Sequence, residues 1–269
     1  MVPYYQRGIK LGEENNKLQY FENAGIIARR IKEDLLRRIV SPGQKLIEIA
    51  EMIESEIEKM GGKPAFPVNI GIGNITAHFT PKENEEDTLP EDSIIKIDFG
   101  VHINGYPVDN AISFYFGENN NYKEMIETAR EAVYRAIDIM KPSLPLSEIG
   151  HVIEEFVKER GFKVVEKLNG HLMDQYDLHG EKEVPVVASA KSPGVLEKGE
   201  VYAVEVFVTN GNGRVRATDE IRIYSLPDKL PRRIPIHIRI AREILRSVSY
   251  THLRAHETEA DLVCRLLLE

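Results

Sequence analysis

The sequence contains no tryptophan and a single cysteine, Cys264, among its 269 residues. One cysteine cannot form a disulfide within the chain, so a disulfide-stabilised scaffold is excluded and a reducing cytoplasm is indicated. Basic residues are in the minority, with 35 Lys and Arg against 43 Asp and Glu, and the formal net charge of -8 argues against a nucleic-acid partner. No apolar run approaches the roughly 18 residues that a membrane span needs, and the first residues lack the pattern of a signal peptide.

What is present is a globular composition, 42% hydrophobic and 29% charged. Apolar residues at helical spacing predict helices over 13–40, 46–60, 122–140 and 147–160, the last capped by Ser147. Alternating or continuous apolar runs predict strands over 66–75, 95–110, 162–165 and 201–208. Helices and hairpins follow each other without a regular βαβ alternation, which predicts an α+β fold.

One hairpin carries two aspartates. Asn104-Gly105 separates two short apolar stretches, and this dipeptide is the strongest short hairpin signal. A two-residue turn sets the register, so we expect Gly100 to face Asp109. Asp98 shares the face of Gly100 and therefore lies diagonally from Asp109, roughly 7–8 Å away at the backbone. Two such carboxylates repel unless a divalent cation lies between them, although an Asp beside a turn is also commonly a simple turn residue.

Four further residues could complete a metal site. Glu205 lies in an apolar run, where a carboxylate is costly unless it is paired or bound to a metal. His78, His171 and His179 are each, taken singly, more often surface or capped residues. Together with the two aspartates, one Glu and one His form an oxygen-rich set that suits manganese, iron, cobalt or zinc, and carboxylates can also bridge two ions that activate one water.

These residues and their surroundings resemble a known family. The resemblance rests on Asn-Ala-Gly-Ile-Ile-Ala at 23–28, Ala-His at 77–78, Lys-Ile-Asp-Phe-Gly at 96–100, Asn-Gly-His at 169–171, and on Asp109, His179 and Glu205. Over about residues 15–246 the chain resembles type 2 methionine aminopeptidases, especially the short archaeal kind. The resemblance implies a pita-bread fold, with two pseudo-symmetric α+β halves around a dinuclear metal centre. It also implies removal of the initiator methionine from new chains whose second residue is small.

The resemblance assigns the metal ligands residue by residue. Asp98 corresponds to the bidentate ligand of one metal and Asp109 to the ligand that bridges both. His171 corresponds to the ligand of the second metal, and Glu205 to a further ligand. The implied cofactor is a pair of divalent ions, either cobalt, manganese, iron or zinc.

The resemblance also implies how substrate binds. His78 and His179 correspond to the two histidines that hydrogen-bond substrate and polarise the scissile carbonyl, and they are the candidate catalytic residues. Phe66 and Leu178 correspond to walls of a methionine pocket, since an unbranched thioether needs an apolar slot. The implied reaction is attack of a metal-activated hydroxide on the scissile carbonyl, with the oxyanion stabilised by the metals and histidines.

The implied partners are nascent polypeptide N-termini that begin with methionine, and the implied protein is a cytoplasmic monomer without membrane or nucleic-acid partners. Docking on the ribosome stays open. Two alternatives are an Xaa-Pro aminopeptidase or prolidase, and a non-catalytic binding protein built on the same fold. The Asn-Gly-His context at 169–171 argues against the first, and the presence of all four ligand candidates argues against the second.

The end of the chain departs from this resemblance. Residues 247–269 resemble the translation of a transposon end and sequencing adapter, so we expect a catalytic domain over 1–246 followed by a non-native tail. The alternative is a genuine amphipathic helix. The family's fifth metal ligand, a second Glu near its C-terminus, has no counterpart up to residue 246. We therefore expect the 269-residue chain itself to be inactive or poorly folded, while the intact gene encodes an active enzyme. Cys264 would then carry no function, and a cysteine-free remainder still excludes disulfides but says less about the redox compartment.

Overall fold

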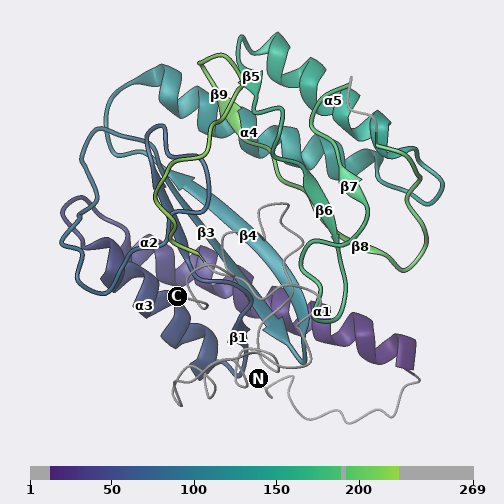
Figure 1. The fold of residues 1–269 in the computed structure, drawn as a ribbon, viewed down its shortest axis with the longest axis horizontal. Coiled ribbons are helices and arrows are strands. Elements are labelled where there is room, and N and C mark those ends of the chain that lie inside the picture. Colours follow the sequence, from purple (N-terminus) through teal and green to yellow (C-terminus); the bar gives the residue numbers. More distant parts are fainter. Residues whose placement is uncertain (1–12, 189–191, 224–269) are drawn as a thin grey trace.

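The computed structural model describes residues 13–188 and 192–223 (Figure 1). Helix α1 (Glu13–Arg30) continues through a π-helical turn, Ile31–Leu35, into α2 (Leu36–Ile39). The helix predicted over 13–40 is therefore confirmed, with one wider turn inside it. Helix α3 (Leu46–Lys59) follows after a short turn.

The first sheet is built around a long central strand. That strand is β3 (Ile95–Ile103), which pairs along one edge with β4 (Tyr106–Phe114). Along its other edge it pairs antiparallel with the short strands β1 (Lys63–Pro64) and β2 (Asn69–Ile72). Helix α1 contacts both β3 and β4, so this sheet has a helical layer on one side (Figure 1).

The second half repeats this plan on a smaller scale. It contains two helices, α4 (Asn120–Ile139) and α5 (Leu146–Glu159). Its strands are β5 (Lys163–Val164), β6 (Gly170–Met173), β7 (Glu183–Val184), β8 (Val201–Ala203) and β9 (Val208–Thr209). β6 lies between β7 and β8, and β5 pairs with β9. In Figure 1 the helices of both halves lie on the outside and the strands lie between them.

The two halves are related by an internal repeat. Helices α3 and α5 each contain 14 residues and begin at Leu46 and Leu146, a shift of 100 positions. Both bury the same positions at helical spacing, namely Leu46, Ile49, Ala50, Ile53 and Ile57 in α3, and Leu146, Ile149, Gly150, Ile153 and Val157 in α5. The turn before each helix donates a backbone hydrogen bond of 2.8 Å, from Gly43 to Leu89 and from Ser143 to Leu196. The expected pita-bread architecture with two pseudo-symmetric halves is confirmed.

Each half has its own apolar core, and a third cluster joins them. Phe21 of α1 and Ala65 of the first half pack with Met173 of β6, Leu178 and Ala203 of the second half. Because burial of apolar side chains stabilises a fold in proportion to the area removed from water, this cluster holds the two halves together beside the inner strands.

The predicted hairpin register is confirmed, because Gly100 pairs with Asp109. Asn104 and Gly105 both have positive φ, 51° and 84°, as this turn requires. Two other predictions were wrong. Ser147 lies inside the first turn of α5, where the N-cap position is Pro145, and residues 201–208 form two strands rather than one. The break arises because β8 pairs with β6 whereas β9 pairs with β5, so residues 204–207 cross between sheets.

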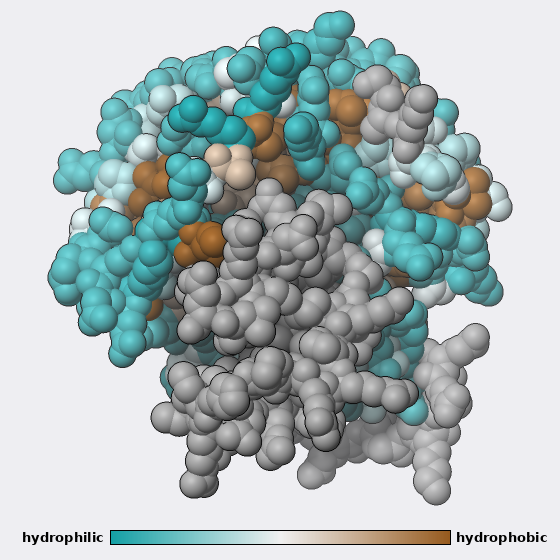
Figure 2. Space-filling view, in the orientation of Figure 1, coloured by the Kyte–Doolittle hydropathy of each residue, from teal (hydrophilic) through white to brown (hydrophobic). Residues whose placement is uncertain are grey.

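Hydrophilic side chains cover most of the coloured surface in Figure 2, and the hydrophobic patches between them are small and separated. Within the described ranges, no helix has both the length and the apolar content needed to cross a membrane. The predicted tail, residues 247–269, and Cys264 within it lie outside the residues that the structure describes.

Candidate metal centre

The candidate site lies where the two halves meet. Asp98 and Asp109 project from β3 and β4 of the first half, and their face is fixed by the hairpin register. His171 lies on β6, opposite Ala203 of β8, in the second half. Glu205 follows β8 directly, in the segment that crosses to the other sheet.

Three of these side chains converge on one point. The Nε2 atom of His171 lies 2.9 Å from Oε1 of Glu205 and 3.5 Å from Oδ2 of Asp109. One ligand atom from each of the three residues lies within 4.8 Å of the other two. His171 is buried, with 3% of its surface exposed. The structure thus brings together residues that are far apart in sequence, since 62 positions separate Asp109 from His171 and 34 separate His171 from Glu205.

Asp98 belongs to the same electrostatic environment without joining that group of three. Burial raises the pKa of the Asp98 carboxyl well above its usual range, and the charges of Asp109 and Glu205 raise it further. The amide Nδ2 of Asn69 on β2 donates a hydrogen bond of 3.4 Å to Oδ2 of Asp98. The ionised form of a carboxylate that is buried beside two others is unfavourable unless a cation lies close to it.

Two nearby basic side chains, His171 and Lys96, partly balance the negative charge of these carboxylates. Burial favours the neutral imidazole of His171, but its contacts with Asp109 and Glu205 outweigh this and raise its pKa to about 10. Burial likewise raises the pKa of Glu205, and contact with His171 opposes that rise. Lys96 shares the strand face of Asp98, and burial lowers its pKa to about 8 although Asp98 and Glu205 act in the opposite direction.

The two other predicted histidines lie beside this cluster. The ring of His179 lies 4.2 Å from that of His171, measured between centroids. His78 is exposed and has a positive φ of 58°, and its imidazole is close enough to Glu205 to oppose slightly the rise in the pKa of that carboxyl, which burial dominates. The site therefore has a histidine on each of two loops, one from each half.

The predicted pocket residues lie in the apolar cluster that joins the halves. Leu178 is a buried member of that cluster, and Phe66 packs against it together with Val108 of β4. The ring of Phe66 lies directly over Gly100, where an added Cβ would come within 2.5 Å of the ring carbon Cε1. Val108 directly precedes Asp109 in the chain, and Leu178 directly precedes His179. The apolar cluster therefore lies next to both of these candidate site residues.

Sequence reasoning missed two polar neighbours of the site. Asn69 and Lys96 both lie at positions that alternate with buried apolar residues. Asn69 hydrogen-bonds Asp98, and Lys96 interacts with it electrostatically. The signal that could have found them is a polar side chain among the apolar residues of the two strands that flank a predicted ligand.

The donor set fits a divalent metal. Two carboxylates and one buried imidazole nitrogen within 4.8 Å of one another form a mixed oxygen and nitrogen shell, which suits borderline divalent ions. The third carboxylate, Asp98, shares the repulsion that such a cation removes.

Comparisons with known proteins agree with this geometry. The model of metallopeptidase family M24 matches residues 19–225, and the chain belongs to this family of metal-dependent hydrolases. Within it, the chain is similar to archaeal methionine aminopeptidases. The methionine aminopeptidase of Archaeoglobus fulgidus is 40% identical over 225 residues, which cover 84% of this chain and 74% of that protein.

Solved structures show the same fold. The methionine aminopeptidase of Thermotoga maritima superposes with a TM-score of 0.69 at 26% identity, covering 79% of this chain and 86% of that one. The prolidase of Pyrococcus furiosus gives 0.63 at 24% identity, covering 74% and 57%, and shows the shared fold alone. The expectation of a prolidase-like enzyme is therefore less well supported than that of a methionine aminopeptidase.

Proposed function

We propose that this protein removes the N-terminal methionine from newly made polypeptides by metal-dependent hydrolysis of the first peptide bond. The observation that carries the proposal is the convergence of Asp109, His171 and Glu205 at the junction of the two halves, in a chain similar to archaeal methionine aminopeptidases over most of its length. Initiator methionine removal, rather than cleavage before proline, is the activity that the sequence similarity favours.

The site would hold two divalent cations, and four residues would bind them. Asp98, Asp109 and Glu205 would hold the ions through carboxylate oxygens, and His171 through an imidazole nitrogen. When bound, such ions lower the pKa of water and polarise a carbonyl oxygen. Asn69 fixes the orientation of the Asp98 carboxylate through its amide, which is how outer partners commonly tune metal ligands.

The substrate would be held by groups that the chain itself supplies. We assign His78 and His179 to hydrogen bonds with the scissile peptide group, where they stabilise negative charge that develops on its oxygen. Phe66 and Leu178 would form walls of an apolar slot for the methionine side chain, since both lie in the cluster beside the metal ligands.

The partners follow from this role. The substrates would be nascent chains with methionine followed by a small residue, in the cytoplasm, with the enzyme acting as a monomer. Contact with the ribosome is compatible with such substrates, and co-sedimentation with ribosomes would test it.

The sequence of residues 247–269 determines which protein should be assayed. We propose that this segment derives from a sequencing adapter, and we call the product of the genomic reading frame beyond residue 246 the natural-frame protein. The natural-frame protein is expected to be active, and the 269-residue chain to be inactive.

A competition between two peptides tests the proposed function. With cobalt or manganese present, the natural-frame protein should release methionine from Met-Ala-Ser and leave an Ala-Pro peptide intact. Preferred cleavage of the Ala-Pro peptide would establish the prolidase-like alternative, and failure to bind any divalent ion would support a non-catalytic binding protein.

A further inference from the structure

The loop that carries His78 has little regular secondary structure to hold it. Residues 76–85 lie outside all helices and strands, and His78 itself has a left-handed backbone conformation. Such a conformation is unfavourable for a residue other than glycine and persists only where the surroundings impose it. One backbone hydrogen bond of 2.7 Å, from Ile70 of β2 to the carbonyl of Phe79, ties this loop to the first sheet.

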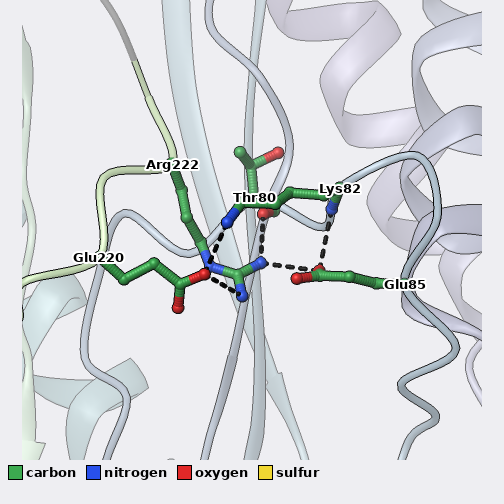
Figure 3. A network of polar contacts seen from close by, with 5 residues as sticks. All are labelled: Thr80, Lys82, Glu85, Glu220 and Arg222. Atoms are coloured by element: carbon green, nitrogen blue, oxygen red, sulfur yellow. Dashed lines mark hydrogen bonds and ion pairs between the residues drawn. The ribbon is translucent and has the colours of Figure 1, made fainter.

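A distant arginine supplies contacts on the other side of the loop. The guanidinium of Arg222 lies 3.7 Å from the ring centroid of Phe79, the residue next to His78. Its Nη1 atom donates to the carbonyl of Thr80 at 3.0 Å and to Oε2 of Glu85 at 2.7 Å (Figure 3). Arg222 therefore touches three points of one loop, and its side chain is only 7% exposed.

The same contacts extend into a small network of charges. Glu220 accepts from Lys82 at 2.6 Å and lies 3.1 Å from Nη2 of Arg222. The backbone N–H of Lys82 donates in turn to Glu85 at 2.9 Å. Figure 3 shows the guanidinium between the two carboxylates, with the loop residues on one side and the segment of Glu220 and Arg222 on the other. A partly buried arginine with both carboxylates paired is more rigid than an exposed ion pair.

We propose that Arg222 is a positioning residue, which holds the His78 loop against the segment that follows Glu205 and so places the His78 imidazole for substrate. The inference rests on the proposed function, because it assumes that His78 contacts the scissile peptide group. Arg222 and Glu205 both lie in the segment that follows β8. The contacts of Arg222 with the His78 loop therefore link the position of His78 to the segment that carries Glu205.

A double-mutant cycle separates positioning from general stability. In the natural-frame protein, Arg222→Ala should lower kcat on Met-Ala-Ser about 10-fold or more, as small misplacements of catalytic groups do, while metal affinity by calorimetry stays unchanged. Arg222→Lys should recover part of this loss. In a His78→Ala background, Arg222→Ala should cause no further loss, because the group that it positions is gone. The exposed Arg216 provides a matched control, and Arg216→Ala should leave kcat unchanged.

The outcomes distinguish this inference from the proposed function. Suppose that the unmodified protein releases methionine and that Arg222→Ala lowers kcat by the same factor with and without His78. The positioning role is then overturned while the proposed function stands. If the unmodified protein releases no methionine, the NMR resonance of the His78 imidazole still tests the positioning role. That resonance is identified by its absence from the spectrum of His78→Ala. A shift of that resonance in Arg222→Ala but not in Arg216→Ala supports positioning, and an unchanged resonance in both refutes it.

Discussion

At the scale of single residues, the candidate metal centre has a histidine between two carboxylates. His171 is buried and its Nε2 atom lies within 3.5 Å of both Asp109 and Glu205. A buried imidazole in this position can balance one negative charge when protonated, or bind a cation when neutral. Binding of a metal ion at this site would therefore displace a proton.

We expect His171→Ala to weaken binding of manganese or cobalt by roughly 100-fold or more, since even partners that only orient a ligand contribute 10–100-fold. His151, which lies on α5 with 59% of its side chain exposed, provides the matched control. Isothermal titration calorimetry measures both. Equal affinity in His171→Ala and His151→Ala would remove His171 from the ligand set.

Metal binding should also depend on pH. The carboxylates of Asp109 and Glu205, acting against burial, raise the pKa of His171 to about 10, so the metal-free imidazole is protonated at neutral pH. A cation must displace that proton, so affinity should rise as pH increases from 6 to 8, and binding should release at least one proton. Calorimetry in two buffers of different ionisation enthalpy counts the released protons, and binding without proton release would contradict this assignment.

The same pKa shift contributes to the pH dependence of stability in the metal-free protein. A raised histidine pKa stabilises the folded state fully below its unfolded value of about 6.5, and this stabilisation is lost as pH rises towards the folded value of about 10. The raised pKa of Asp98 acts in the same direction, because ionising that buried carboxyl also costs stability as pH rises above its usual range.

At the scale of elements, the β3–β4 hairpin sets the geometry of the site. Tyr176 contacts its tip, with its backbone N–H donating to Gly105 at 2.8 Å and its ring packed where a Cβ on Gly105 would lie. The hairpin tip therefore supports the loop that carries His179.

Substituting that glycine tests this contact. Gly105 has φ 84° and an added Cβ would come within 2.6 Å of the Tyr176 ring, whereas Gly43 has φ 83° and open space around it. Gly43→Ala should cost about 1 kcal/mol from backbone strain alone. Gly105→Ala should cost about 1–3 kcal/mol more because the ring must move. Urea unfolding of the two variants measures the difference, and equal losses would show that the ring contact has no energetic effect.

The elements also show what sequence can and cannot predict. The hairpin register was predictable because Asn104-Gly105 permits one turn geometry, and helices α3 and α5 were predictable from their apolar spacing. The break between β8 and β9 was not, because an apolar run carries no sign of which strands it will pair with.

Candidate ligands could be named from their residue types, yet their convergence could not be derived from spacing. His171 reaches Asp109 only because the two halves pack together through the cluster of Phe21, Met173 and Leu178. Arg222 was missed for the same reason, since its contacts with Thr80 and Glu85 join segments far apart in sequence.

At the scale of the whole molecule, the candidate metal centre is built from residues of both halves. Asp98 and Asp109 come from the first sheet, and His171 and Glu205 from the second half. A cation bound by both sets stabilises the assembled molecule relative to the unfolded chain by about 2.7 kcal/mol when it is present at 100 times its dissociation constant.

Metal should therefore raise the melting temperature of the natural-frame protein, and chelation should reverse the rise. Differential scanning calorimetry measures this shift. The variant Asp109→Asn removes one of the proposed ligand carboxylates and should abolish the shift, whereas the exposed-site variant His151→Ala should retain it. A shift that persists in Asp109→Asn would place the ion elsewhere.

The most direct test of the central claim is methionine release from Met-Ala-Ser, titrated with manganese or cobalt after chelation of all metal. The natural-frame protein should release methionine only as metal is restored, and Asp109→Asn should lose about 100-fold or more of this activity at the same metal concentration. Methionine release that is independent of metal, or that is unchanged in Asp109→Asn, would contradict the assignment of catalysis to the site between Asp109, His171 and Glu205.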